Sequence, residues 1–81
     1  MSGPRIEPLG DDALLGRFGD AIGSDTNQRV HALARHLRQR APAWLRDLVP
    51  AYASLGVFFD SARMQGEDPH DVIAEAVAGW A

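Results

Sequence analysis

The chain has 81 residues, which is enough for one small domain with a modest core and too few for a large multidomain enzyme. It contains no cysteine, which excludes disulfides and thiolate sites and suits a cytoplasmic location. The net charge of −3 is unevenly spread, because residues 26–46 carry five arginines and no acid while residues 47–81 carry six acids and one arginine. No apolar run approaches the length of a membrane span, so no membrane contact is expected.

The first part of the chain predicts a hairpin after a disordered tail at residues 1–4. Strands are expected at Arg5–Leu9 and Ala13–Phe18, joined by turn chemistry at residues 10–12. Alternation in the second strand places Leu14, Gly16 and Phe18 toward the core. The opposite face takes Ala13, Leu15 and Arg17, and Gly16 marks either a bulge or a site of close packing.

A helix is predicted next, capped by Ser24 or Asp25 and running to about Arg40 before Pro42 stops it. Its apolar residues recur with helical spacing and form one stripe. The stripe comprises Val30, Leu33, Ala34, Leu37 and Ala41.

The second part of the chain repeats the hairpin and helix. Strands are expected at Leu45–Val49 and Ser54–Phe59, and their short connection makes them antiparallel neighbours. Leu55, Val57 and Phe59 should face the core, and Gly56 and Phe58 the other side. Asp68 is expected to cap a final helix that begins at Pro69. Its buried stripe comprises Val72, Ile73, Ala76, Val77 and Trp80.

The predicted fold is therefore α+β, with the order β-β-α-β-β-α, and residues 5–81 form a single domain. Two helices on one face of a four-stranded antiparallel sheet are its simplest arrangement. That arrangement leaves the other sheet face uncovered. We expect Leu15, Trp44, Tyr52 and Phe58 to lie there and to form an interface.

No residue set predicts a catalytic centre, a metal site or a cofactor. His31 and His36 are five residues apart, whereas a metal-binding pair on a helix is spaced by four. Asp11 and Asp12 are adjacent turn residues that diverge rather than act as paired carboxylates. Ser54 and Ser61 lie in no nucleophile motif.

The arginines of the first predicted helix suggest a nucleic-acid alternative. Arg29, His36 and Arg40 recur at i, i+7 and i+11, with Arg35 and Arg38 beside them, so a phosphate backbone could lie along them. The acidic net charge and the lack of interleaved aromatic residues argue against this interpretation.

Three segments resemble the KipI/PxpB family, which includes the kinase inhibitor KipI, the B subunit of 5-oxoprolinase and allophanate hydrolase subunit 1. The first is I-E-P-L-G-D-D-A-L-L at 6–15, followed by R-F-G-D at 17–20. The second is N-x-R-V-H-A-L at 27–33. The third, residues 47–60, is similar to the family's V-P-x-Y-R-S-L-L-V-x-Y-D pattern. Ala53, Gly56 and Ser61 depart from that pattern.

The resemblance implies a DCoH-like N-terminal domain that precedes a cyclophilin-like domain in the family. It also implies multi-subunit assemblies that open 5-oxoproline with ATP or hydrolyse allophanate, and a member that binds a histidine kinase. Ala53 stands where the family usually has arginine, which puts any role of that arginine in doubt for this chain.

We therefore expect a non-catalytic protein-interaction domain, not an enzyme by itself and without a cofactor. Its expected partner is a cyclophilin-like domain, a partner subunit, a histidine kinase or a second copy of the chain. The alternative is a composite 5-oxoprolinase or allophanate hydrolase active site, to which Arg17, Tyr52 and Ser54 would contribute.

Overall fold

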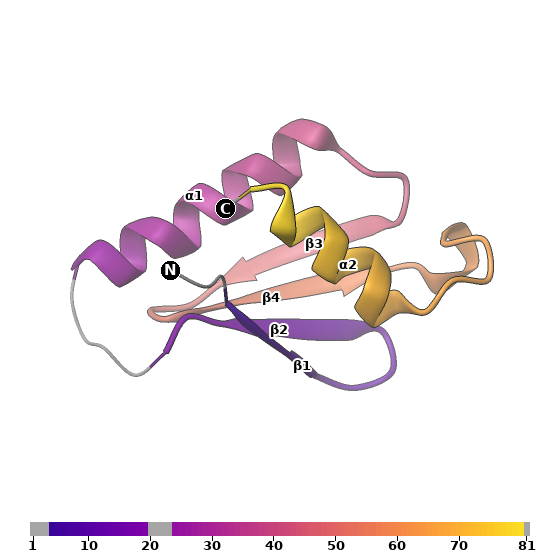
Figure 1. The fold of residues 1–81 in the computed structure, drawn as a ribbon, viewed down its shortest axis with the longest axis horizontal. Helices are drawn as coiled ribbons and strands as arrows, with labels where there is room; N and C mark the ends of the chain where they lie inside the picture. The colour runs from indigo at the N-terminus through magenta and orange to yellow at the C-terminus, as the bar shows by residue number, and fades with distance from the viewer. Residues whose placement is uncertain (1–3, 20–23, 81) are drawn as a thin grey trace.

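The computed structural model describes residues 4–19 and 24–80. Its strands and helices follow the predicted order, with one short 3₁₀ helix added (Figure 1). The predicted disorder of residues 1–3 and the predicted loop at 20–23 lie outside the described residues. The elements are β1 (Arg5–Pro8), β2 (Ala13–Arg17), α1 (Ser24–Arg40), β3 (Leu45–Pro50), β4 (Ser54–Phe59), η1 (Ser61–Arg63) and α2 (Pro69–Ala78).

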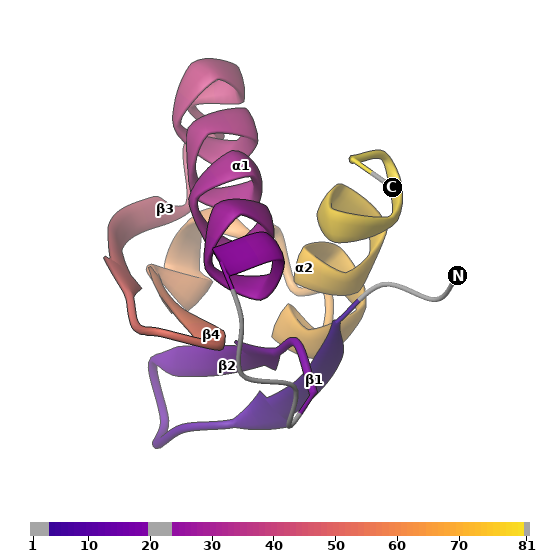
Figure 2. The same ribbon diagram turned by 90° about the vertical axis from the view of Figure 1, so that its left-hand side faces the viewer.

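The four strands form one antiparallel sheet in the order β1-β2-β4-β3. Both helices lie on the same side of it, with α1 toward β3 and β4 and α2 toward β1 (Figure 2). The predicted α+β fold is confirmed. The hairpins join at β2 and β4, which pair from Ala13 with Phe58 to Arg17 with Ser54.

The core lies between the sheet and the two helices, and β4 supplies its centre. Leu55, Val57 and Phe59 are all 3% exposed or less, as the period-two pattern predicts. The predicted stripe residues of α1 from Val30 to Leu37 are equally buried above them. Within the described part of the chain, no helix is both long and apolar enough to cross a bilayer.

Gly16 marks close packing rather than a bulge. It pairs regularly with Ile6 on one side and Leu55 on the other. A Cβ at Gly16 would lie 3.7 Å from the Pro4 side chain, so Pro4 packs over the strand instead of belonging to a disordered tail. The irregularity in the sheet lies elsewhere, between Leu45 and Asp47 of β3.

The C-terminal end of α1 departs from the predicted stripe. Ala41 is exposed and has a φ of 46°, so it follows the helix instead of continuing its buried face. Its N–H donates to the carbonyl of Leu37 and closes the last turn in the left-handed conformation that glycine usually takes. The next residue, Pro42, cannot extend the helical ladder. The prediction that Ala41 faces the core was wrong for this reason.

Replacing Ala41 with glycine should stabilise the protein. An alanine in the left-handed region carries a steric cost that glycine lacks. We expect Ala41→Gly to raise the free energy of unfolding by roughly 0.5–1 kcal/mol after the greater chain entropy of glycine is included. Urea denaturation measures this change. Ala43→Gly is the matched control, because Ala43 is also exposed but has no positive φ; equal effects of the two substitutions would refute the explanation.

The short segment before α2 has its own cap. Asp60 precedes η1, and its Oδ1 accepts a hydrogen bond from the Ala62 N–H at 3.1 Å. Asp60 also lies 3.5 Å from the Arg63 guanidinium. Asp68 occupies the predicted cap position of α2, with Pro69 in the first turn, but its side chain makes no capping hydrogen bond.

The two aspartates should therefore differ when replaced by alanine. Asp60→Ala removes a hydrogen bond to a helix-end N–H and should cost about 1 kcal/mol. Asp68→Ala removes only a charge near the helix N-terminus and should cost roughly 0.3 kcal/mol. Thermal unfolding of both variants compares them, and a larger loss for Asp68→Ala would contradict this assignment.

Candidate interaction surface

The sheet face away from the helices is a grid that the strand register defines. One row across the sheet is Arg5, Arg17 and Ser54; the next is Glu7, Leu15, Gly56 and Val49; the third is Ala13, Phe58 and Asp47. Side chains in one row point the same way because directly paired residues share a face. The face therefore has an apolar patch of Leu15, Val49 and Phe58 bordered by charged residues, with Arg5, Glu7 and Arg17 on one side and Asp47 on the other. We call it the open face.

Phe58 is the largest apolar side chain of the open face. A Cβ built at Gly56 would lie 3.6 Å from Phe58 Cε1 and 3.6 Å from Val49 Cβ, so the ring lies over the glycine and beside the valine. Phe58 and Leu15 are half-buried, and Val49 is 49% exposed. Because Gly56 has no side chain, the Phe58 ring can lie directly over the strand backbone. This explains one of the departures from the family pattern.

One end of the open face carries an ion-pair cluster. Arg17 Nε and Nη2 each donate to a Glu7 carboxylate oxygen at 3.3 Å. Arg5 lies 4.0 Å from the same carboxylate. These side chains are substantially exposed, so the pairs contribute little to stability. Their main effect is to leave one net positive charge at this end.

The other end is hollowed and acidic. A cavity of about 370 Å³ is lined by Asp12, Arg46, Asp47, Val49 and Phe58. The carboxylate of Asp47 accepts the Leu48 N–H at 2.8 Å, which satisfies a backbone donor of the edge strand β3. Asp11 is exposed in the adjoining turn. Three carboxylates and one guanidinium give this end a net negative charge.

Leu15 and Phe58 lie on the open face as predicted, but Trp44 does not. Trp44 is 8% exposed and belongs to the core cluster on the helix side. Trp44 lies in the turn before β3. Its carbonyl accepts a hydrogen bond from the Asp60 N–H, and this bond holds Trp44 beside the end of β4. Strand alternation does not govern a turn residue, so the prediction was wrong. Tyr52 is 51% exposed in the turn between β3 and β4.

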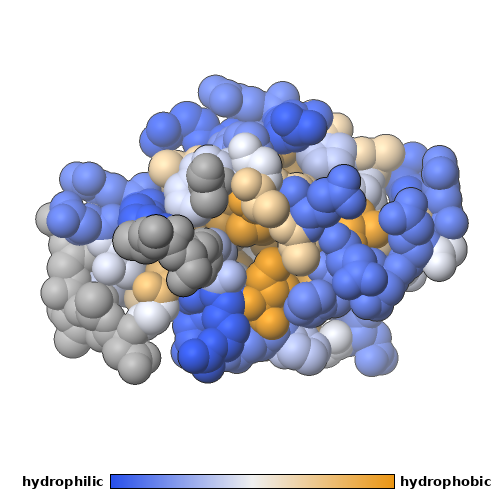
Figure 3. All heavy atoms as spheres, in the orientation of Figure 1, coloured by the Kyte–Doolittle hydropathy of each residue, from blue (hydrophilic) through white to orange (hydrophobic). Residues whose placement is uncertain are grey.

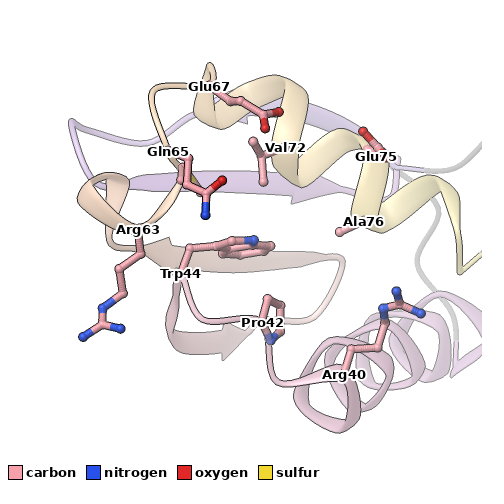
Figure 4. A pocket seen from close by; sticks show the side chains of 10 residues that line it. Arg40, Pro42, Trp44, Arg63, Gln65, Glu67, Val72, Glu75 and Ala76 are labelled. Carbon is pink, nitrogen blue, oxygen red and sulfur yellow. The ribbon is translucent and has the colours of Figure 1, made fainter.

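A second hollow, of about 390 Å³, lies over Trp44. Figure 4 shows the indole between Pro42 and Val72, with the Arg63 guanidinium turned away from the other side chains. Residues from the end of α1, from the segment after η1 and from α2 line it. No sequence pattern indicates this hollow, because three segments distant in sequence form it.

The burial of Trp44 can be tested against the exposure of Tyr52. Trp44→Ala should lower the free energy of unfolding by about 3–5 kcal/mol, because it leaves a cavity in the core. Tyr52→Ala should cost less than about 0.5 kcal/mol, since its side chain is exposed. Chemical denaturation of both variants provides the comparison. Similar losses for the two would place Trp44 outside the core.

The arginine stripe of α1 is interrupted at its start. The Arg29 guanidinium lies 5.2 Å from the Phe18 ring centre and 5.7 Å from that of Trp80. The two rings meet edge to face with centroids 5.9 Å apart. Arg29 thus joins α1 to the ends of β2 and α2 through cation–π contacts. This role is structural. Because the Arg29 guanidinium contacts the two rings, it does not extend into solvent with the other arginines of α1 to bind phosphates.

The rest of the stripe is also uneven. His36 is only partly exposed, and its Nε2 is buried without a hydrogen bond from any described residue. Arg35, Arg38 and Arg40 are exposed. Figure 3 shows hydrophilic side chains along α1 at the top of the view. This side of α1 is a solvated helix face. The predicted residues Arg29, His36 and Arg40 do not form a continuous exposed stripe along it.

The residues of the predicted composite site share one end of the sheet. Arg17 and Ser54 are paired across β2 and β4, and Tyr52 lies two residues before Ser54. The carbonyl of Tyr52 accepts a hydrogen bond from Asn27 of α1 at 3.4 Å. Arg17 is already held by Glu7. Among the described residues, no group of three or more histidines or carboxylates could hold a metal ion.

These features define a class: a small α+β domain with helices on one sheet face and a partly apolar, charge-edged face on the other. The model of the family described as carboxyltransferase domain, subdomains C and D, matches residues 4–80. The chain belongs to this family, which is the KipI/PxpB family.

The similar proteins agree with this assignment. The chain is 39% identical over 56 residues to the B subunit of 5-oxoprolinase from Bacillus subtilis (strain 168), a match that covers 69% of the chain and 23% of that protein. A conserved uncharacterized protein from Pyrococcus horikoshii superposes with a TM-score of 0.83 and is 39% identical. The match covers 94% of the present chain and 35% of the Pyrococcus chain. The N-terminal domain of the histidine kinase inhibitor KipI from Bacillus subtilis superposes with a TM-score of 0.76 and is 29% identical. The match covers 94% of the present chain and 81% of the KipI domain.

The chain thus spans less than a quarter of the length of the curated relative that it matches. It corresponds in extent to the KipI N-terminal domain much better than to either longer protein.

Proposed function

We propose that this chain is a non-catalytic protein-interaction domain of the KipI/PxpB type and that it binds its partner through the open face. The observation that carries the proposal is the apolar middle of that face, formed by Leu15, Val49 and Phe58, within a charged rim. An apolar centre with a polar rim is the usual anatomy of a protein interface.

The comparisons support a protein partner. A relative is named as a subunit, and a structural neighbour is named as an inhibitor of a histidine kinase, so both act together with other proteins. The chain matches only part of the longer relatives. The remainder of such an assembly is the natural partner for the open face, either as a further domain or as a separate subunit in the cytoplasm.

Phe58→Arg should weaken this interaction while the domain remains folded. The substitution places a charge in the apolar middle of the open face, where a bound partner would desolvate it. We expect at least a roughly tenfold loss of affinity for a partner subunit of the 5-oxoprolinase type. Isothermal titration calorimetry measures the loss, and circular dichroism checks the fold.

Arg35→Asp is the matched control, because it changes charge on the exposed face of α1, on the helix side of the sheet. It should leave the affinity unchanged. If Phe58→Arg binds as tightly as the unmodified chain, or if Arg35→Asp weakens binding equally, the open face is not the binding surface.

A second candidate function is a contribution to a composite 5-oxoprolinase or allophanate hydrolase site. It is favoured by the direct pairing of Arg17 with Ser54 beside Tyr52 at one end of the sheet. Adding the chain to its partner subunits should then support 5-oxoproline-dependent ATP hydrolysis or allophanate hydrolysis. Ser54→Ala should lower turnover without weakening assembly. Unchanged turnover would remove this candidate.

A further inference from the structure

We infer that the hollow over Trp44 is a second binding site, separate from the open face, and that it takes a basic segment of a partner protein. A backbone carbonyl of that segment accepts the indole N–H of Trp44, and an arginine side chain of the segment lies between Glu67 and Glu75. The hollow is on the helix side of the sheet, so this inference goes beyond the proposed function and does not depend on it.

The indole N–H of Trp44 has no acceptor within the domain. Trp44 is 8% exposed, and its N–H donates a hydrogen bond to no described residue. A buried indole N–H normally has an acceptor. Among the described residues, only His36 Nε2 is a fully buried side-chain atom without a partner, so the Trp44 nitrogen retains access to the hollow that Trp44 lines. The site therefore offers a donor to an oxygen atom of a bound molecule.

The rim of the hollow is acidic. It contains the carboxylates of Glu67 and Glu75 and the guanidinium groups of Arg40 and Arg63. Arg63 lies 3.5 Å from Asp60, which offsets its charge, and Figure 4 shows it turned away from the other side chains. The other three charged groups form no ion pair with a described residue. Two carboxylates against one guanidinium leave the rim with an excess of negative charge, which favours a cationic ligand.

The charges are also separated across the hollow. Glu67 precedes α2 and Glu75 lies within it, whereas Arg40 is the last residue of α1 (Figure 4). A bound group therefore meets negative charge on the side of α2 and positive charge on the side of α1. An arginine side chain fits the α2 side, because its planar fork can donate to two carboxylates at once. The backbone carbonyl of the same segment fits the donors of Trp44 and Arg40.

A tight turn positions one of the two carboxylates. Gln65 and Gly66 have φ angles of 58° and 81°, and the Glu67 N–H donates to the Met64 carbonyl at 3.1 Å. Positive φ at both central residues is characteristic of a type I′ turn. Met64 is 3% exposed and anchors the turn in the core. The backbone of Glu67 is therefore fixed at the rim by a hydrogen bond and by packing.

The size of the hollow limits what can bind. Its volume of about 390 Å³ is at the lower end of the roughly 300–1,000 Å³ of ligand pockets, so it takes one or two residues of an extended segment and not a whole helix. Apolar side chains around the charged groups would contact the stem of the arginine. They are those of Pro42, Met64, Val72 and Ala76. Because the ion pairs are exposed, a short peptide should bind with a dissociation constant on the order of 1 mM, and more weakly when salt is added.

Two matched peptides test the site. The first is acetyl-Gly-Arg-Gly-amide, and the second has citrulline in place of arginine, which keeps the shape of the side chain and removes its charge. Titration into the ¹⁵N-labelled protein follows the indole N–H signals of Trp44 and Trp80. The arginine peptide should shift the Trp44 signal with saturation and leave that of Trp80, which does not line the hollow, unchanged. It should bind roughly fivefold more tightly than the citrulline peptide.

Single substitutions identify the groups that bind. Glu67→Gln and Glu75→Gln should each weaken binding of the arginine peptide about threefold, because each removes one ion pair. Trp44→Phe should weaken it about threefold as well, because it keeps a ring in the core and removes the N–H. Asp71→Asn is the matched control, since Asp71 is also an exposed carboxylate of α2 but does not line the hollow. It should leave the affinity unchanged.

Three results would overturn the inference. They are an unshifted Trp44 signal at about 10 mM arginine peptide, equal binding of the citrulline peptide, and a loss of affinity in Asp71→Asn as large as that in Glu67→Gln. Circular dichroism checks that the variants are folded, and the two glutamate variants decide if Trp44→Phe unfolds. Phe58→Arg should bind the arginine peptide with unchanged affinity, so failure of this site and failure of the open face are distinguishable.

Discussion

The rest of the structure depends on the burial of β4 between its two neighbours. Leu55, Val57 and Phe59 are the inward side chains of this strand, and they are almost completely buried beneath the helices. Because side chains alternate along a strand, this burial forces Gly56 and Phe58 to the opposite face. A shift of one residue in the register would exchange the two sets, so the hydrophobic core fixes the register and also the composition of the open face.

The open face follows from that constraint and from one glycine. The Phe58 ring lies over Gly56 and shields the sheet backbone there without a covering layer of helices. The charged residues border the apolar side chains and leave them accessible. Apolar area of this kind, left uncovered between charged residues, is typical of interaction surfaces.

The helix side has a different organisation. Trp44 closes the core beneath η1 and α2, and Arg29 joins the Phe18 and Trp80 rings at the opposite end of α2. The short α2 has no side-chain hydrogen bond at its N-cap, so these packing contacts hold it in place. The arginines of α1 therefore do not act as one group. Arg29 is structural, whereas Arg35, Arg38 and Arg40 remain exposed.

The sequence by itself determined the element order, the inward residues of β4 and the positions of Leu15 and Phe58 on the open face. Period-two and helical patterns record which side chains avoid water, and this preference is local to each element. Only the tertiary structure decided that Trp44 turns into the core, that Ala41 leaves the helix, and that Pro4 packs on Gly16. It also decided the hollow over Trp44 and the separation of charge on the open face. Turns follow no hydrophobic period, and these features arise from contacts between residues distant in the chain.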